Sequence, residues 1–264
     1  MRSFDYHRPE TLAQAAAILG SDDVRPLAGG MTLLPTMKLR LSAPSALVDL
    51  SAISGLSEIS VKGNDLIIGA MTTHDAVNRS EMVQSAVPAL AVLAGKIGDP
   101  QVRNRGTIGG SVANNDPTAD YPAAVLALGA TIVTDRREIA ADDFFKGLFE
   151  TALQAGEIIT AVRFPIPERA GYAKLPNPAS RFAIVGVFVA KFADGVRTAV
   201  TGAAPCVFRA ALIEEALSKE FSASAIERIT IDPTPLSSDI HADAEYRAHV
   251  ATVMAQRAVT AALS

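Results

Sequence analysis

The sequence predicts an α+β protein that ends in a small domain of its own. Its 264 residues are 49% hydrophobic but only 5% aromatic, a composition that favours helices packed on sheets. Helix patterns and short strand patterns are mixed through the first two thirds of the chain. The last hundred residues contain three antiparallel strand patterns and then helix patterns, the order expected of a separate α+β domain.

The first fifty residues read as helix, strand, turn, helix and strand. Residues 11–19 are Ala-rich with apolar side chains at helical spacing, and strands are expected over 24–28 and 46–50. Between the strands, Thr32 is expected to cap a short helix. Gly29-Gly30 stands just before this helix, where backbone amides and the positive helix end suit a phosphate, although a plain turn is the alternative.

Neither of the two common nucleotide fingerprints is present at this glycine pair. The segment is not G-x-G-x-x-G, nor is it the P-loop pattern G-x-x-x-x-G-K-[ST]. A standard Rossmann dehydrogenase and a P-loop NTPase are therefore both excluded as predictions.

The middle of the chain begins with a hairpin pattern and continues with helices. Two strand patterns, 56–61 and 65–70, flank Lys62-Gly63-Asn64. Thr73 is expected to cap a short helix, and an apolar helix is expected over 87–97 with Pro88 in its first turn.

A second glycine cluster lies within residues 103–130. Gly106, Gly109 and Gly110 allow a sharp turn and a close approach of the backbone to another group. The amides of residues 108–111 and the hydroxyls of Thr107 and Ser111 would donate to a phosphate ahead of a helix. The sequence therefore predicts a loop for the phosphates and sugar of a nucleotide.

Two aspartates follow this cluster, and each has two open interpretations. Asp116 precedes Pro117, and Asp120 lies two residues before Pro122, so both fit helix capping. Alternatively, one of them accepts hydrogen bonds from sugar or ribityl hydroxyls. Lys174, at the end of a strand pattern, is similarly either a ligand contact or a surface lysine.

The remaining elements are expected on either side of a Pro-rich boundary at residues 165–167. Strands are expected over 131–134, 137–140, 158–164, 172–175, 183–192 and 196–201. Helices are expected over 210–219, 223–229 and 242–262.

Composition excludes several classes of function. The net charge of −4 gives no basic face for nucleic acid. The single cysteine, Cys206, excludes a disulfide framework and a cysteine-ligated iron–sulfur cluster within this chain, and the four histidines lack metal spacing. The amino terminus has no apolar signal core, and no apolar run is long enough to span a membrane, so a cytoplasmic protein is expected.

Three segments together resemble one known family. They are AGGMTLLP at 28–35, RNRGTIGGS at 103–111 and DPTADYP at 116–122. They are similar to the FAD-binding medium subunits of molybdenum hydroxylases, the family of carbon monoxide dehydrogenase medium chains and xanthine dehydrogenase FAD subunits. The likeness extends over essentially the whole chain.

The resemblance implies a fold and a set of cofactor contacts. A two-subdomain FAD-binding (PCMH-type) unit would span residues 1–168, divided into about 1–55 and 56–168, and a flavoprotein C-terminal domain with a three-stranded antiparallel sheet would span 169–264. Two glycine segments would hold the FAD pyrophosphate from two sides, Asp120 would bind the sugar or ribityl part, and Lys174 would lie near the flavin ring. The full implied set is Ala28, Gly29, Gly30, Met31, Thr32, Leu33, Leu34, Lys38, Thr107, Ile108, Gly109, Gly110, Ser111, Ala113, Asp116, Asp120 and Lys174.

The resemblance also implies partners and a reaction. A large molybdopterin-binding subunit and a small [2Fe–2S] subunit would complete the complex, as a dimer of heterotrimers, and FAD would pass electrons from the clusters to an external acceptor. The substrate would be bound by another chain. No catalytic acid–base pair and no metal ligand are expected here. The alternatives are a standalone flavin oxidase and a nucleotide-binding assembly module without redox turnover.

Overall fold

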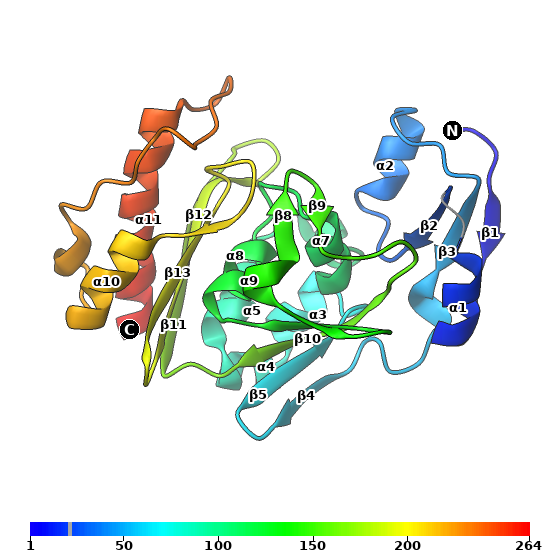
Figure 1. The fold of residues 1–264 in the computed structure, drawn as a ribbon, viewed down its shortest axis with the longest axis horizontal. Helices are drawn as coiled ribbons and strands as arrows, with labels where there is room; N and C mark the ends of the chain where they lie inside the picture. Colours follow the sequence, from blue (N-terminus) through cyan, green and yellow to red (C-terminus); the bar gives the residue numbers. More distant parts are fainter. Residues whose placement is uncertain (21–22) are drawn as a thin grey trace.

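The computed structural model describes residues 1–20 and 23–264. Three parts follow one another along the long axis of the molecule: an N-terminal subdomain, a central unit and a C-terminal sheet covered by helices (Figure 1). The α+β class is confirmed. Within the described ranges, none of the helices combines the length and apolar character that crossing a membrane requires.

The N-terminal subdomain is a small parallel sheet with two helices. The strand order is β1 (Asp5–His7), β3 (Ala46–Asp49), β2 (Val24–Leu27), and the helices are α1 (Leu12–Ile18) and α2 (Leu33–Lys38), with a 3-10 turn η1 (Leu50–Ala52). Thr11 caps α1 through the amide of Gln14. Strand β1 was not predicted, because all three of its residues are exposed and carry no apolar pattern. The expected Thr32 cap is wrong: its side chain makes no capping bond to any described residue.

The central unit is built on a five-stranded antiparallel sheet. The order is β4 (Ile59–Lys62), β5 (Asp65–Gly69), β10 (Ile159–Pro165), β6 (Thr131–Thr134), β7 (Glu138–Ala140). The predicted 56–70 hairpin is present as β4–β5. Strand β10 enters between β5 and β6 from far along the chain, so its place in the sheet is a tertiary feature.

Short helices connect the strands of the central unit. They are α3 (His74–Arg79), α4 (Glu81–Ala86), α5 (Pro88–Gly95), α6 (Pro100–Arg103), α7 (Ile108–Asn114), α8 (Tyr121–Ala127) and α9 (Ala141–Phe144), and a small hairpin pairs β8 (Phe145–Gly147) with β9 (Glu150–Thr151). Thr73 caps α3 as predicted. Helix α5 also has Pro88 in its first turn, as predicted.

The C-terminal part is an antiparallel sheet of four strands. The order is β11 (Arg169–Pro176), β12 (Ala183–Phe192), β13 (Gly195–Thr201), β14 (Phe208–Arg209), followed by α10 (Ala211–Lys219), η2 (Ser224–Ile226) and α11 (Ala244–Leu263). The prediction of three strands missed β14, which has only two residues. The helix expected over 223–229 is a three-residue 3-10 turn.

Both faces of this C-terminal sheet are buried. Phe188 and Ala190 belong to the core of the central unit, whereas the alternating residues Val187 and Val189 face the opposite way and pack with the residues of α11. Gly171 lies so close to α11 that a Cβ there would be 1.9 Å from the Ala258 carbonyl oxygen. The sheet is therefore the shared wall between the central core and the C-terminal helices.

Candidate cofactor-binding cleft

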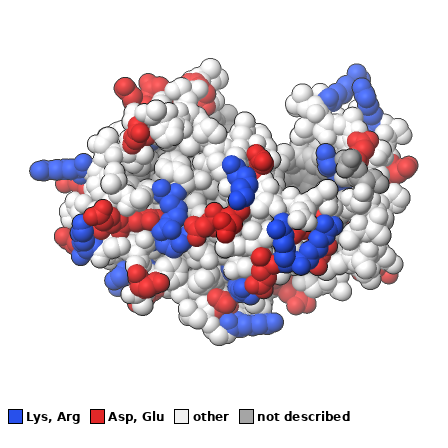
Figure 2. Space-filling view, in the orientation of Figure 1, with Lys and Arg blue, Asp and Glu red and all other residues white. Residues whose placement is uncertain are grey.

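The two glycine segments predicted from the sequence lie against each other. A Cβ on Gly29 would stand 1.9 Å from the carbonyl oxygen of Arg105, and a Cβ on Gly110 would stand 3.6 Å from the Cβ of Ala28. Only a glycine at position 29 permits this backbone contact. It joins the N-terminal subdomain to the central unit, and Figure 2 shows the surface notched between these two parts.

A cavity of about 560 Å³ opens beside this contact, a size typical of ligand sites. It brings together thirteen of the seventeen candidate residues: Ala28, Gly29, Gly30, Met31, Thr32, Leu33, Thr107, Gly109, Gly110, Ser111, Ala113, Asp116 and Asp120. Its apolar wall includes Leu50, Ile97, Ile158, Ile159 and Phe182. The cavity therefore offers polar groups on two sides and apolar surface for an aromatic ring.

Four candidate residues do not line the cavity. Ile108 is fully buried in the central core, and Leu34 packs its side chain over the position where Gly30 would carry a Cβ. Lys38 is exposed at the last turn of α2. Lys174 lies behind Asp120, with its side chain 3% exposed.

The second glycine segment is not the open loop that the sequence predicted. Helix α7 begins inside it, and Thr107 caps this helix by accepting the Gly110 amide at 3.1 Å. The amides of Ile108 and Gly109 donate to the carbonyls of Thr72 and Ala70, and that of Ser111 donates to Thr107. The prediction that residues 108–111 present a run of free donors is therefore wrong, because the fold already uses these N–H groups.

The free backbone donors belong instead to the first segment. Among the described residues, no acceptor is bound by the amides of Gly29, Gly30, Met31, Thr32 and Leu33, all of which line the cavity. Gly30 has φ +71°, a conformation that glycine adopts without strain and that turns the chain into α2. Backbone N–H groups in folded proteins are nearly always hydrogen-bonded, so these five amides are suited to bind an anionic ligand.

The two aspartates have different surroundings. Asp116 accepts from the Thr118 amide and hydroxyl at 2.8 and 2.6 Å, which closes a turn, and α8 begins only at Tyr121. Of the two interpretations of Asp116, helix capping with a start at Pro117 is therefore wrong. Asp120 directly precedes α8, but its side chain caps no amide in the described chain.

Asp120 instead forms a buried polar cluster at one side of the cavity. Its carboxylate lies 2.8 Å from the Lys174 ammonium and accepts a hydrogen bond from the Tyr172 hydroxyl. Burial raises the pKa of the Asp120 carboxyl, while Lys174 and Tyr172 act in the opposite direction. Lys174 also donates to the Arg181 carbonyl at 2.8 Å. Asp120 is thus oriented toward the cavity by two partners from the C-terminal sheet.

His74 is a cavity residue that was missed from the sequence. Its imidazole is 5% exposed and lies 5.4 Å from the ring of Tyr121, and its Nδ1 has no partner in the described part of the chain. Burial, with help from the Arg103 cation, lowers the pKa of His74 to about 4, so the ring is neutral at pH 7. A Cβ on Gly106 would lie 2.6 Å from its Nε2, which accounts for the glycine.

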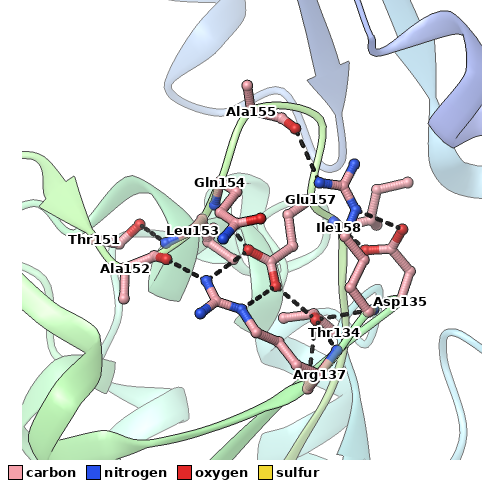
Figure 3. Close-up of polar contacts among 11 residues, drawn as sticks. Thr134, Asp135, Arg137, Thr151, Ala152, Leu153, Gln154, Ala155, Glu157 and Ile158 are labelled. Carbon is pink, nitrogen blue, oxygen red and sulfur yellow. Dashed lines mark hydrogen bonds and ion pairs between the residues drawn. The ribbon is translucent and has the colours of Figure 1, made fainter.

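The segment between β9 and β10 forms another wall, which the sequence also did not predict. Leu153, Glu157 and Ile158 line the cavity there. Glu157 is 7% exposed and is held by the β6–β7 turn (Figure 3). The available signal in the sequence was that the acidic Glu157 comes just before an apolar strand, because a carboxylate that is buried there needs a partner.

The fold and cleft together define a protein that binds a nucleotide cofactor. Free amides suit phosphate oxygens, a fixed carboxylate suits sugar or ribityl hydroxyls, and the apolar wall suits a ring system. Two family models match the chain: the FAD binding domain in molybdopterin dehydrogenase over residues 2–167, and the CO dehydrogenase flavoprotein C-terminal domain over residues 170–262. The chain belongs to this family of FAD-binding subunits of molybdenum hydroxylases.

Curated relatives and solved structures agree with this family over nearly full length. The carbon monoxide dehydrogenase medium chain of Afipia carboxidovorans is 39% identical, covering 97% of this chain and 96% of that protein. The nicotine 6-hydroxylase medium subunit of Paenarthrobacter nicotinovorans is 34% identical, with coverage of 97% and 96%. A chain of the reconstituted CO dehydrogenase from Oligotropha carboxidovorans superposes with a TM-score of 0.90 at 36% identity, covering 99% and 98%.

Proposed function

We propose that this chain is the FAD-binding, electron-transferring subunit of a molybdenum hydroxylase complex. The observation that carries the proposal is the contact of the two glycine segments at a cavity. One side of this cavity holds five amides that bind no acceptor among the described residues, and another side holds Asp120. Bound FAD supplies the redox chemistry, and the protein supplies binding, orientation and exclusion of water.

The proposed roles of the residues follow from where they lie. The amides of Gly29 to Leu33 hold the pyrophosphate, and Gly110 leaves the space that this group needs. Asp120 accepts hydrogen bonds from sugar or ribityl hydroxyls. Lys174 acts from behind Asp120, as the counter-ion of a buried carboxylate whose negative charge would otherwise be uncompensated.

The finer organisation is part of the same proposal. The FAD unit covers residues 1–168, in subdomains of about 1–55 and 56–168, and the flavoprotein C-terminal domain covers 169–264. The partners are a large molybdopterin-binding subunit and a small [2Fe–2S] subunit, as a dimer of heterotrimers in the cytoplasm. The partner subunits bind the substrate and determine whether it is carbon monoxide, a purine, an aldehyde or an N-heterocycle.

The test is to purify the tagged chain from its native host and to follow its flavin. We expect one FAD per chain, co-purification with molybdenum- and iron-containing chains, and flavin reduction only when those chains and their substrate are present. Reduction of the flavin by an organic substrate without the partners would instead establish a standalone oxidase. A purified chain without flavin would overturn the proposal in favour of a nucleotide-binding assembly module.

A further inference from the structure

The segment 152–158 contacts both the cavity and the N-terminal subdomain. Ile158 lines the cavity and also packs in the hydrophobic cluster of that subdomain, which includes Ala15 and Leu19. At Gly156 the backbones are close enough that a Cβ would lie 2.9 Å from the Leu19 carbonyl oxygen. The position of this segment therefore influences how the N-terminal subdomain stands across the cleft.

The turn between β6 and β7 holds this segment through one carboxylate. Glu157 accepts hydrogen bonds from the Thr134 hydroxyl at 2.8 Å, from Nε and Nη2 of Arg137 at 2.9 and 3.0 Å, and from the Gln154 amide at 2.8 Å (Figure 3). A carboxylate has about four lone-pair sites, so these four donors use its full capacity. Glu157 thus acts on the protein itself and not on a ligand.

Further hydrogen bonds run between the same turn and the segment. Arg137 Nη2 donates to the Ala152 carbonyl at 2.6 Å, and Arg136 Nη1 donates to the Ala155 carbonyl at 3.2 Å. The amide of Ile158 donates to Asp135 Oδ1 at 2.8 Å. The segment is therefore fixed near its start, in its middle and at its end by the residues of one turn (Figure 3).

The network depends on the charge of its central pair. The Glu157 side chain has no exposed surface, whereas that of Arg137 is 41% exposed. The hydrogen bonds from Arg137 contribute most to lowering the pKa of Glu157 to about 2, so the pair is ionised throughout the physiological range. Removing one member leaves the other with an unsatisfied charge or unsatisfied hydrogen bonds, and the segment loses its main anchor.

We propose that the Arg137–Glu157 ion pair is a positioning device for the cofactor cleft. By fixing residues 152–158, it sets the distance between the N-terminal subdomain, with its unpaired amides at 29–33, and the Asp120 side of the cavity. The pair controls FAD retention through this segment, because the Glu157 side chain has no exposed surface and accepts its hydrogen bonds from protein groups. This inference rests on the proposed binding of FAD in this cleft.

The test measures the rate of FAD release from the tagged full chain, purified with its native partners. The variants are Glu157→Gln, Arg137→Met and the double variant, with Glu138→Gln as the matched control. Glu138 pairs with Arg163 through two hydrogen bonds in the same sheet, but it is 53% exposed on its side chain and is not a cavity residue. After dilution, the recovery of free-flavin fluorescence gives the release rate.

We expect each single variant to release FAD about tenfold faster, in the range seen for residues that act on a site without contacting its ligand. Glu138→Gln is expected to stay within about twofold of the wild type, as is usual for an exposed pair. The double variant should release FAD no faster than either single variant, since both substitutions remove the same interaction. Arg137→Lys keeps the positive charge but loses the paired N–H donors of the guanidinium group. Its FAD release rate should therefore fall between those of the wild type and Arg137→Met.

Two outcomes would overturn the inference separately from the function. If the variants melt at lower temperature but their folded chains release FAD at the wild-type rate, the pair serves stability alone. If the double variant shows the sum of two independent effects, the residues do not act as a pair. A wild-type chain without FAD would instead refute the proposed function. Should Glu157→Gln fail to fold, the FAD release rate of Arg137→Lys tests the inference: a rate equal to that of the wild type would overturn it.

Discussion

The carboxylate of Asp120 lies 2.8 Å from the ammonium of Lys174, and each side chain is 3% exposed. The two residues are 54 positions apart in sequence and come from different parts of the fold, the start of α8 and strand β11. Removing one member of such a buried pair strongly destabilises the fold, whereas replacing both members destabilises it much less. The cleft and the C-terminal sheet are therefore linked by charge as well as by packing.

We expect Asp120→Asn to lower the stability of the chain by about 3–5 kcal/mol, because Lys174 is left as an uncompensated buried charge. The additional change Lys174→Met should restore most of this loss. FAD retention should be lost in both variants, because both lack the carboxylate that we propose binds the cofactor hydroxyls. Urea unfolding and flavin content measure the two effects separately. Retention of FAD by the double variant would show that Asp120 is only structural.

The glycines of the second segment should differ in what they tolerate. A Cβ at Gly110 would lie 3.0 Å from Thr107 Oγ1 and 3.6 Å from the Ala28 Cβ, whereas a Cβ at Gly109 would lie 2.5 Å from the Ala70 Cβ. Gly110→Val should therefore fold but fail to retain FAD. Gly109→Ala should lose about 1–3 kcal/mol of stability through overpacking. The checks are melting temperature and flavin stoichiometry, and normal FAD content in Gly110→Val would contradict the site.

His74 should make stability depend on pH in a defined window. Its pKa is lowered from 6.5 to about 4 in the folded chain, so between these values the unfolded chain binds the proton and the folded chain does not. Stability should therefore fall as pH decreases from 6.5 to 4, by up to about 3 kcal/mol for a shift of this size. His74→Gln should flatten the curve of unfolding free energy in this window. If the unfolding free energy of His74→Gln still falls with the same slope between pH 6.5 and 4, other titratable groups cause the pH dependence.

Cutting the chain at residue 168 should not yield a soluble, folded FAD unit. Tyr172 and Phe188 belong to the central core, together with residues of α8. Removing residues 169–264 would expose that core and leave Asp120 without Lys174. We expect the 1–168 fragment to aggregate or to bind a hydrophobic dye, and a cooperative unfolding transition of this fragment would argue for an independent domain.

Local patterns accounted for much of the fold but for less of the site. The hairpin at 59–69, the helix starts at Thr11 and Thr73, and the strand 183–192 were all predicted, because periodicity, capping residues and turn residues act over a few positions. Short elements were missed. Strand β1 is fully exposed, and β14 has two residues, so neither carries a readable pattern.

The polar residues of the cleft show what could not be predicted from sequence patterns. The amides of 108–111 looked free in sequence, but Thr72 and Ala70, which occupy two of them, come from another segment. Glu157 and Arg137 were not predicted as a pair, since nothing local specifies that a turn and a distant loop meet. His74 carried no motif, and its neutral state arises only from burial beside Arg103.

The sequence by itself determined the class of elements, the two glycine segments and the family to which they belong, since these depend on residue type and short-range spacing. The tertiary structure alone decided which amides stay unpaired, which carboxylate receives a counter-ion and which turn holds the wall of the cleft. The physical reason is that a hydrogen bond or ion pair between distant residues exists only after packing has brought them together and excluded water. The glycines are local signals, but the cleft that they form with Asp120 is a product of the fold.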